Sequence, residues 1–242
     1  MNLETIFVII LGLSIGSFLN VLIYRIPLGE SIVFPSSHCP KCKVKLKFWH
    51  NIPILSYLFL KGKCSFCNSK ISIQYPIVET ISAVIFLVIY LEFGFNLEAF
   101  LLALLFSIIL ALSVIDLYHK AVPDSLNLTA LTLSIIYPMQ LTEIFNNLED
   151  ALLFGGAFAF LRFYVSYFVK REAMGEGDIM IAGVIGAVLG TYLGAFAIFL
   201  SSILTIPAII IAKERELPYI PFLATALLIT FLFQDIIYKI IF

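Results

Sequence analysis

The sequence contains few charged residues. Asp, Glu, Lys and Arg make up only 13% of the 242 residues, whereas 61% are hydrophobic, and the mean hydropathy is +1.05. Soluble domains carry about 25% charged residues, so this composition excludes an ordinary soluble domain and indicates a polytopic membrane protein. The formal net charge of −1 says little by itself, because the charges are segregated into loops. A nucleic-acid-binding role has no support in the sequence.

A cationic segment is missing from the start of the chain, which reads Met-Asn-Leu-Glu. Secretory signals begin with such a segment, so we expect the first apolar run to be retained as a membrane helix. Runs of about 17 to 25 apolar residues can cross a bilayer as helices. The sequence offers eight of them, so we predict an all-α membrane protein with about eight transmembrane helices: 5–24, 76–92, 98–115, 125–142, 150–169, 179–193, 194–212 and 219–238.

The division between the sixth and seventh runs depends on the segment from Gly190 to Gly194, Gly-Thr-Tyr-Leu-Gly. Two glycines in five residues favour a tight turn, and one long kinked helix is the alternative. A second glycine pair, Gly12 and Gly16, has the G-x-x-x-G spacing of closely packed membrane helices, and we expect the same use for Gly183, Gly186 and Gly190.

The positive charges gather on one side of the predicted membrane. Thirteen of the fifteen Lys and Arg residues fall in alternate loops, whereas the opposite loops carry no Lys or Arg, which places both chain ends outside the cytoplasm. The acidic residues of the opposite loops are Glu92, Glu98, Glu143, Glu149 and Asp150. Arg162 lies within a span and Lys239 near the far end. The thirteen are Arg25, Lys41, Lys43, Lys45, Lys47, Lys61, Lys63, Lys70, Lys120, Lys170, Arg171, Lys213 and Arg215.

All four cysteines lie in the 51-residue stretch from Arg25 to Tyr75, the longest polar segment. They form two C-x2-C pairs, Cys39 with Cys42 and Cys64 with Cys67, with 21 residues between the pairs. Four thiolates in this pattern bind Zn²⁺ in a closed, structural site. We therefore predict a small cytoplasmic zinc-binding loop domain, in which disulfides are the weaker interpretation because the compartment is reducing.

Two aspartates are the candidates for chemistry. Asp116 ends the third predicted helix, and Asp178 begins the sixth, so helix parity places both at the cytoplasmic interface. Two carboxylates that converge can share a proton and activate water. A helix cap is the plain alternative for Asp178, whereas Asp116 gains nothing from the negative end of its own helix. Asp124 is a reserve candidate that we expect to cap the fourth helix.

Asp178 follows two glycines in the segment Gly175-Glu176-Gly177-Asp178. Neither glycine has a Cβ, so the backbone can bend sharply there and we expect an extended substrate to approach closely.

The residues resemble those of the bacterial prepilin peptidases, the GxGD-type membrane aspartyl proteases that process type IV prepilins and related secretion pseudopilins. The resemblance covers essentially the whole chain. Its motifs are Gly16-Ser17-Phe18-Leu19-Asn20-Val21 with Tyr24-Arg25-Ile26-Pro27, both C-x2-C pairs around Asn51-Ile52-Pro53-Ile54-Leu55-Ser56-Tyr57, Tyr75-Pro76-Ile77-Val78-Glu79, Asp116 with Pro123-Asp124, and Gly175-Glu176-Gly177-Asp178.

This resemblance implies a catalytic pair of Asp116 and Asp178 and zinc on the four cysteines. It also implies a short basic leader, cut after a glycine at the cytoplasmic face of the bacterial inner membrane, and methylation of the new amino terminus by S-adenosylmethionine. The implied domains are a first helix at 1–24, a loop domain at 25–75 and a peptidase domain at 76–242. A peptidase without methyltransferase activity is the alternative.

The resemblance does not locate the methyl-donor site. By resemblance, Asn20, Arg25 and Glu79 are the candidates to take part in it. One departure is Met180, where the family commonly has lysine, and we expect it to leave the proton affinity of the aspartate pair slightly higher.

Other polar residues have plainer interpretations. We expect Arg162 to reach the interface, with an ion pair to Glu79 as the alternative. His50 is expected to pack in the loop, His38 is a spare metal ligand and His119 a weak acid–base candidate. Two rival functions are a proton-coupled transporter, whose acidic residues usually lie near the midplane, and a noncatalytic scaffold.

Overall fold

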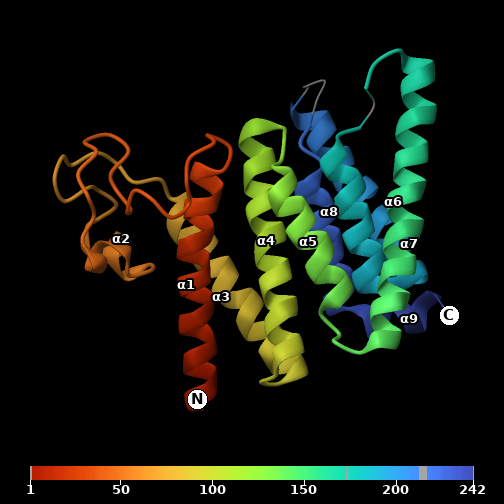
Figure 1. Ribbon diagram of the computed structural model, residues 1–242, viewed down its shortest axis with the longest axis horizontal. Coiled ribbons are helices and arrows are strands. Elements are labelled where there is room, and N and C mark those ends of the chain that lie inside the picture. Colours follow the sequence, from red (N-terminus) through yellow and green to blue (C-terminus); the bar gives the residue numbers. More distant parts are fainter. Residues whose placement is uncertain (1, 173, 213–216, 242) are drawn as a thin grey trace. The chain divides into compact units, whose positions relative to one another are not determined.

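The computed structural model describes residues 2–172, 174–212 and 217–241, and Figure 1 shows that these are mainly helices. The two basic residues Lys213 and Arg215, which the charge pattern counted on the cytoplasmic side, lie outside this set. Contacts divide the chain into two compact units, one up to Ala111 (unit 1) and one from Leu112 onward (unit 2), with the boundary inside a helix. The predicted domain boundaries at residues 25 and 76 stay predictions.

Unit 1 is built on two long helices, α1 (Leu3–Arg25) and α3 (Gln74–Phe93), which pack against each other. A Cβ at Gly12 would lie 2.8 Å from the Cα of Ala83, and a Cβ at Gly16 would lie 2.6 Å from the Cα of Glu79. The Ser82 hydroxyl donates a 2.8 Å hydrogen bond to the Gly12 carbonyl across this contact. The predicted packing role of the G-x-x-x-G motif is therefore confirmed.

The polar segment between α1 and α3 contains two short helical turns, η1 (Phe48–Asn51) and α2 (Leu55–Phe59), and two isolated antiparallel bridges. Unit 1 ends in the first part of α4 (Leu97–His119).

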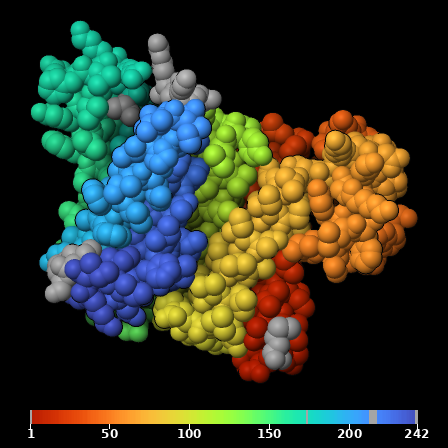
Figure 2. All heavy atoms as spheres, turned by 180° about the vertical axis from the view of Figure 1, so that it is seen from behind, coloured from red at the N-terminus to blue at the C-terminus, as the bar shows by residue number. Residues whose placement is uncertain are grey.

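Unit 2 contains the end of α4, then α5 (Asp124–Ile136), α6 (Leu141–Val169), α7 (Glu176–Ala212), α8 (Ile220–Leu232) and α9 (Gln234–Ile241). α7 is its central element and packs on α5, α6 and α8. Figure 2 shows the contact of α7 with α8 on the rear face. Gly183 and Gly186 let α7 approach the backbone of α6 at Ala151 and Asp150, as predicted. The same prediction is wrong for Gly190, whose conformation is not helical and which makes no close backbone contact with α6.

α7 reverses direction at Gly190, whose φ of 71° and ψ of 179° are not helical. The ring of Phe154 contacts the Cβ positions of both Gly186 and Gly194, which a straight helix would separate by about 12 Å. Thr191 fixes the turn by donating a 2.6 Å hydrogen bond to Asp150. The glycine segment is therefore a turn between two helical segments, and the single kinked helix is not what the chain forms (Figure 1).

The predicted count of about eight spans is not confirmed. Among the described residues five helices are long and apolar enough to cross a membrane when the two segments of α7 are counted together, or six if α8 and α9 also count as one span bent by 81°. α5 ends at Ile136 after only 13 residues, whereas the prediction ran the helix to residue 142. Pro138 has no N–H with which to continue the helical hydrogen bonds. α6 in turn begins at Leu141, nine residues before its predicted start.

Replacing Gly16 by alanine tests the contact between α1 and α3. We expect Gly16→Ala to destabilise the protein by about 1–3 kcal/mol, because the new methyl group would meet the α3 backbone. Gly156→Ala is the matched control, since nothing described lies within 4 Å of a Cβ there and alanine favours a helix. Thermal unfolding in detergent measures both, and equal melting temperatures for the two variants would contradict the packing account.

Candidate functional site

Asp116 lies in the last turn of α4, and the residue is only 6% exposed. Its Oδ2 accepts a 3.1 Å hydrogen bond from the backbone N–H of Ile220, the first residue of α8. The N-terminus of a helix carries partial positive charge and unpaired N–H groups, so it stabilises an anion. The N-terminus of α8 thus stabilises the negative charge of Asp116, which the C-terminal end of α4 does not.

Asp178 occupies the third position of α7 and is half-buried. Its Oδ2 accepts a 3.1 Å hydrogen bond from the N–H of Gly175, the residue that precedes the helix. This contact is the side-chain half of a capping box. The alternative that Asp178 is itself the cap residue is therefore wrong, although its carboxylate does help to fix the start of α7.

The two carboxylates are close enough to interact electrostatically. Ile220 connects their anchors, because its N–H holds Asp116 while its side chain lies 3.2 Å from the Cβ position of Gly177, next to Asp178. The described contacts occupy one oxygen of each carboxylate. The second oxygen of each is left to hold a proton or a water, which two converging carboxylates need for hydrolysis.

Gly177 is buried, and its missing Cβ serves the packing of unit 2. A Cβ there would collide with Val122 and lie 3.2 Å from Ile220 and 3.3 Å from Asn127. At Gly177 the chain itself fills the space that we expected an extended substrate to use, whereas Gly175 is exposed and the expectation stays a prediction there. Close packing beside Asp178 is therefore the structural reason for this glycine.

Asp124 does not cap α5 as predicted, because Pro123 occupies the cap position and Asp124 is the first helical residue, exposed to solvent. His119 is the exposed last residue of α4.

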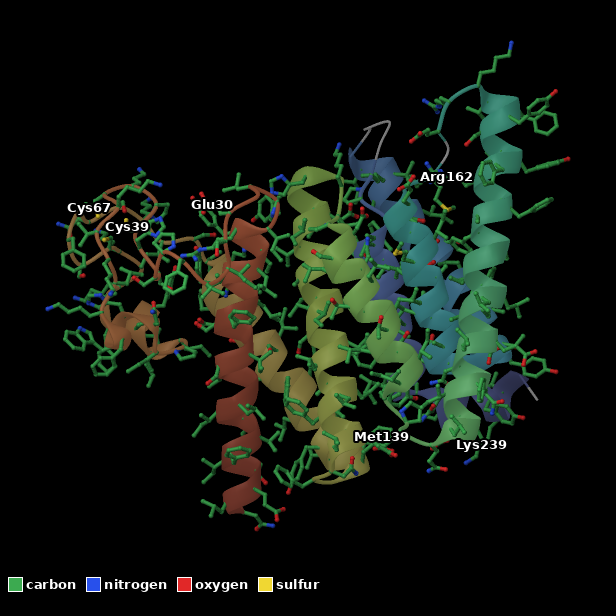
Figure 3. All side chains as sticks on the ribbon, in the orientation of Figure 1. Glu30, Cys39, Cys67, Met139, Arg162 and Lys239 are labelled. Atoms are coloured by element: carbon green, nitrogen blue, oxygen red, sulfur yellow. The ribbon has the colours of Figure 1, made fainter. Side chains whose placement is uncertain are left out.

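Arg162 on α6 forms two ion pairs that the sequence analysis missed. Its guanidinium lies 3.1 Å from Glu176 and 3.6 Å from Glu172, and its side chain is 19% exposed. The alternative pairing with Glu79 would join the two units and stays a prediction. Figure 3 shows Arg162 at the opposite end of unit 2 from Met139 and Lys239. Because Glu176 belongs to the segment that carries Asp178, Arg162 ties α6 to this segment.

The four cysteines of unit 1 come together, with their sulfur atoms all within 4.8 Å of one another. Each pair forms the same turn. The N–H groups of Lys43 and Asn68 donate to the carbonyls of Cys39 and Cys64, and both donor residues have a left-handed φ, 57° and 55°. The sulfurs of Cys39 and Cys67, labelled in Figure 3, are 3.9 Å apart, and none of the four cysteines is in a disulfide.

The electrostatics of this cysteine cluster fit a cation. Burial raises the pKa of Cys39, but hydrogen bonds from the backbone of Cys42 and Lys41 outweigh it and lower the pKa to about 6. The Val44 backbone favours the Cys42 thiolate, yet burial and the neighbouring sulfurs raise the pKa of Cys42 to about 11. Four thiolates therefore cannot ionise together without a compensating charge, and a divalent metal ion provides one.

A group of buried polar residues lies where α1 and α3 meet in unit 1. Glu79 accepts a 2.7 Å hydrogen bond from the N–H of Ile54 and a second one from Ser17. Ile54 has a φ of 59°, a strained value for a β-branched residue, so Glu79 holds the loop in an unusual turn. Asn20 donates to the Tyr75 carbonyl at 3.2 Å, and Arg25 to the Ser31 carbonyl at 2.8 Å.

The remaining histidines are in the loop. His50 packs edge-on against Trp49 and Phe66, as expected for a structural residue. His38 contacts the Ser36 carbonyl and is not among the four clustered ligands.

Comparison with known proteins relates both units to one family. The bacterial peptidase A24 N-terminal domain matches residues 10–93, and the type IV leader peptidase family matches residues 103–210. No solved structure matches the chain.

Several similar proteins carry the name prepilin leader peptidase/N-methyltransferase. The one from Neisseria gonorrhoeae is 33% identical over 95% of this chain and 91% of its own length, and the one from Bacillus subtilis is 34% identical over 93% of each. The one from Myxococcus xanthus is 38% identical over 77% of this chain, but the match spans only 56% of that protein. With these matches, and with two anchored aspartates in one unit and four clustered cysteines in the other, the chain belongs to the type IV leader peptidase family.

Proposed function

We propose that this protein is a membrane aspartyl endopeptidase that removes the short basic leader of type IV prepilins or pseudopilins. The observation that carries the proposal is that Asp116 and Asp178 are each anchored through one oxygen by a backbone N–H at the start of a helix, with Ile220 in contact with both anchor regions. The names of the full-length relatives supply the substrate class. An apolar environment around the pair agrees with a substrate that is itself a membrane helix.

The reaction uses the two carboxyl groups in different states. Two close carboxylates do not both ionise easily, so one holds a proton while the other accepts a proton from water. The water oxygen attacks the carbonyl carbon of the peptide bond, and the protonated partner donates a hydrogen bond to the developing oxyanion. Transfer of a proton to the leaving amine then breaks the C–N bond.

The cut takes place at the cytoplasmic face of the bacterial inner membrane. The distribution of basic residues supports this orientation, because cytoplasmic loops carry an excess of Lys and Arg. The substrate's leader stays in the cytoplasm, and the apolar helix that follows it lies in the membrane. The bond between leader and helix would therefore lie at the cytoplasmic interface, where the two aspartates are predicted. The lysine-rich loop of unit 1 repels a basic leader, so its charge serves orientation and contacts with anionic lipid.

The four cysteines hold a structural Zn²⁺. Zinc prefers tetrahedral thiolate sites, and four protein ligands leave no open position for a substrate. A loop of this length has little apolar core, so the metal contributes much of the folding free energy of the loop.

The protein also methylates the amino terminus that cleavage exposes, with S-adenosylmethionine as the methyl donor. The names of the relatives support this second activity. Unit 1 is its proposed place, because Asn20, Arg25 and Glu79 are buried polar side chains beside the cysteine loop. The aspartate pair of unit 2 is needed for hydrolysis and not for methyl transfer.

Loss of either acid tests the peptidase proposal. We expect Asp116→Asn and Asp178→Asn each to lower leader removal by about 10²- to 10⁴-fold or more, since each substitution removes a proton donor or acceptor. Asp124→Asn is the matched control and should cleave normally. Cleavage of a coexpressed prepilin on gels, with membrane insertion checked separately, measures this effect. Full activity of either dyad variant would reject the pair.

Removal of one cysteine tests the metal site. Cys64→Ser should lower the zinc content from about one atom per chain to near zero and expose the segment between α1 and α3 to protease, because three ligands no longer close the shell. Ser65→Ala, at the next residue, should keep both zinc and protease resistance. Purified wild-type protein without zinc would contradict the assignment.

The two activities can be read from one sample. In mass spectra of a prepilin coexpressed with the protein, we expect the loss of the leader and a gain of about 14 Da on the new amino terminus. This gain is the net mass of CH2 that is added when a methyl group replaces a hydrogen. The Asp178→Asn variant should show neither change. Cleavage by the wild type without the added mass would contradict the proposed methyltransferase activity and support a peptidase without it.

A further inference from the structure

Asn127 has a buried group that nothing in the proposed reaction has yet used. It lies in the first turns of α5 and is 1% exposed, and its Oδ1 accepts no hydrogen bond from any residue that the structure describes. A buried carbonyl without a donor is costly, and most such groups in proteins are paired with protein or with ordered water. The unpaired Oδ1 of Asn127 therefore suggests a hydrogen-bond donor that is a reactant and not part of the chain.

The carboxamide lies close to the residues next to which the two aspartates are anchored. Its Nδ2 is 3.3 Å from the Cβ position of Gly177, the residue before Asp178. Ile220, whose N–H anchors Asp116, lies 3.2 Å from the same point. Asn127 therefore borders the place where the two anchors meet.

The hydrolytic water needs more hydrogen-bond partners than two carboxyl groups provide. Between a protonated and an ionised carboxyl group, the water accepts one hydrogen bond from the acid and donates one to the base. Its second hydrogen is left without an acceptor, and a buried water usually makes about three hydrogen bonds. A neutral amide oxygen can accept this hydrogen without adding a third charge to the site.

We propose that Asn127 positions the hydrolytic water by accepting its second hydrogen on Oδ1. The ionised aspartate takes the first hydrogen as a proton while the water oxygen forms its bond to the carbonyl carbon. The second hydrogen stays on the tetrahedral intermediate as a hydroxyl group and keeps its hydrogen bond to Asn127. No charge forms on Asn127, and its proton count does not change. This inference rests on the proposed peptidase function and adds a residue to the same site.

Thr230 provides a matched control. Its hydroxyl is also fully buried and unpartnered within the described chain, but it lies ten residues after Ile220 on α8, about 15 Å along the helix. Asn127→Leu and Thr230→Val each replace a buried, unpartnered polar group by an apolar one of similar size. Such exchanges are close to neutral or stabilising for the fold.

The experiment compares the two variants in cleavage kinetics and in melting temperature. We expect Asn127→Leu to lower kcat by about 10- to 100-fold with KM within about twofold of the wild type and an unchanged or higher melting temperature, since a misplaced water slows only the chemical step. Thr230→Val should keep the wild-type kcat. Asn127→Ala gives the same kinetic test if the leucine variant does not fold.

Inhibitor binding separates positioning of the water from a packing role. A substrate-sequence peptide with a difluoroketone at the cleavage site hydrates to a diol that resembles the intermediate, whereas a reduced-amide peptide lacks both hydroxyl groups. Asn127→Leu should weaken the diol about tenfold or more and leave the reduced amide within about twofold.

Three results would overturn the inference: a wild-type kcat in Asn127→Leu and Asn127→Ala, a rise in KM at constant kcat, or equal losses for the two inhibitors. A wild-type protein that cuts no prepilin would instead reject the proposed function, so the two failures are distinguishable.

Discussion

Two backbone hydrogen bonds at helix N-termini hold the reactive part of unit 2. Ile220 at the start of α8 donates to Asp116, and Gly175 before α7 donates to Asp178. Burial disfavours charge on a carboxylate, whereas the positive end of a helix favours it, so the site can keep one ionised acid in apolar surroundings. The remaining features of unit 2 serve this arrangement: α7 and α8 must begin side by side, and they do so because α7 reverses at Gly190.

The two units use different means to position polar groups among apolar helices. In unit 2 helix starts and the absent side chain of Gly177 bring the acids together. In unit 1 the glycines of α1 let α3 approach until Glu79 reaches the loop, and the cysteine turns fold a segment that has little apolar core. The acids of unit 2 thus depend on helix packing, whereas the loop of unit 1 depends on the turns that cluster its four cysteines.

The sequence predicts those features whose chemistry is local. The spacing of Gly12 and Gly16 predicts a close helix contact, and the two cysteine pairs predict the cluster of four sulfurs. Helix parity is the basis for placing Asp116 and Asp178 at one interface. The family was recognised from these same motifs. Each of these patterns consists of a few residues close together in the sequence, so it can be recognised without knowledge of the fold.

Features that need partners distant in sequence were missed. The Ile220 anchor joins residues 104 positions apart, and only Pro221 marked a helix start there. Arg162 was expected to reach the interface, or to pair with Glu79, and its ion pairs with Glu172 and Glu176 were not predicted. No glycine or proline in the sequence marks the bend at Phe233 between α8 and α9. Glu149 and Asp150, which we predicted in a loop, lie inside α6.

The central claim is that Asp116 and Asp178 act jointly on one oxygen atom. The most direct measurement is a structure of the protein in lipid with a prepilin peptide whose cleaved bond is replaced by a hydroxyl-bearing carbon. The account predicts the hydroxyl oxygen at about 3 Å from one oxygen of each aspartate. A hydroxyl group bound by one aspartate, with the other carboxylate turned away beyond hydrogen-bond reach, would contradict it.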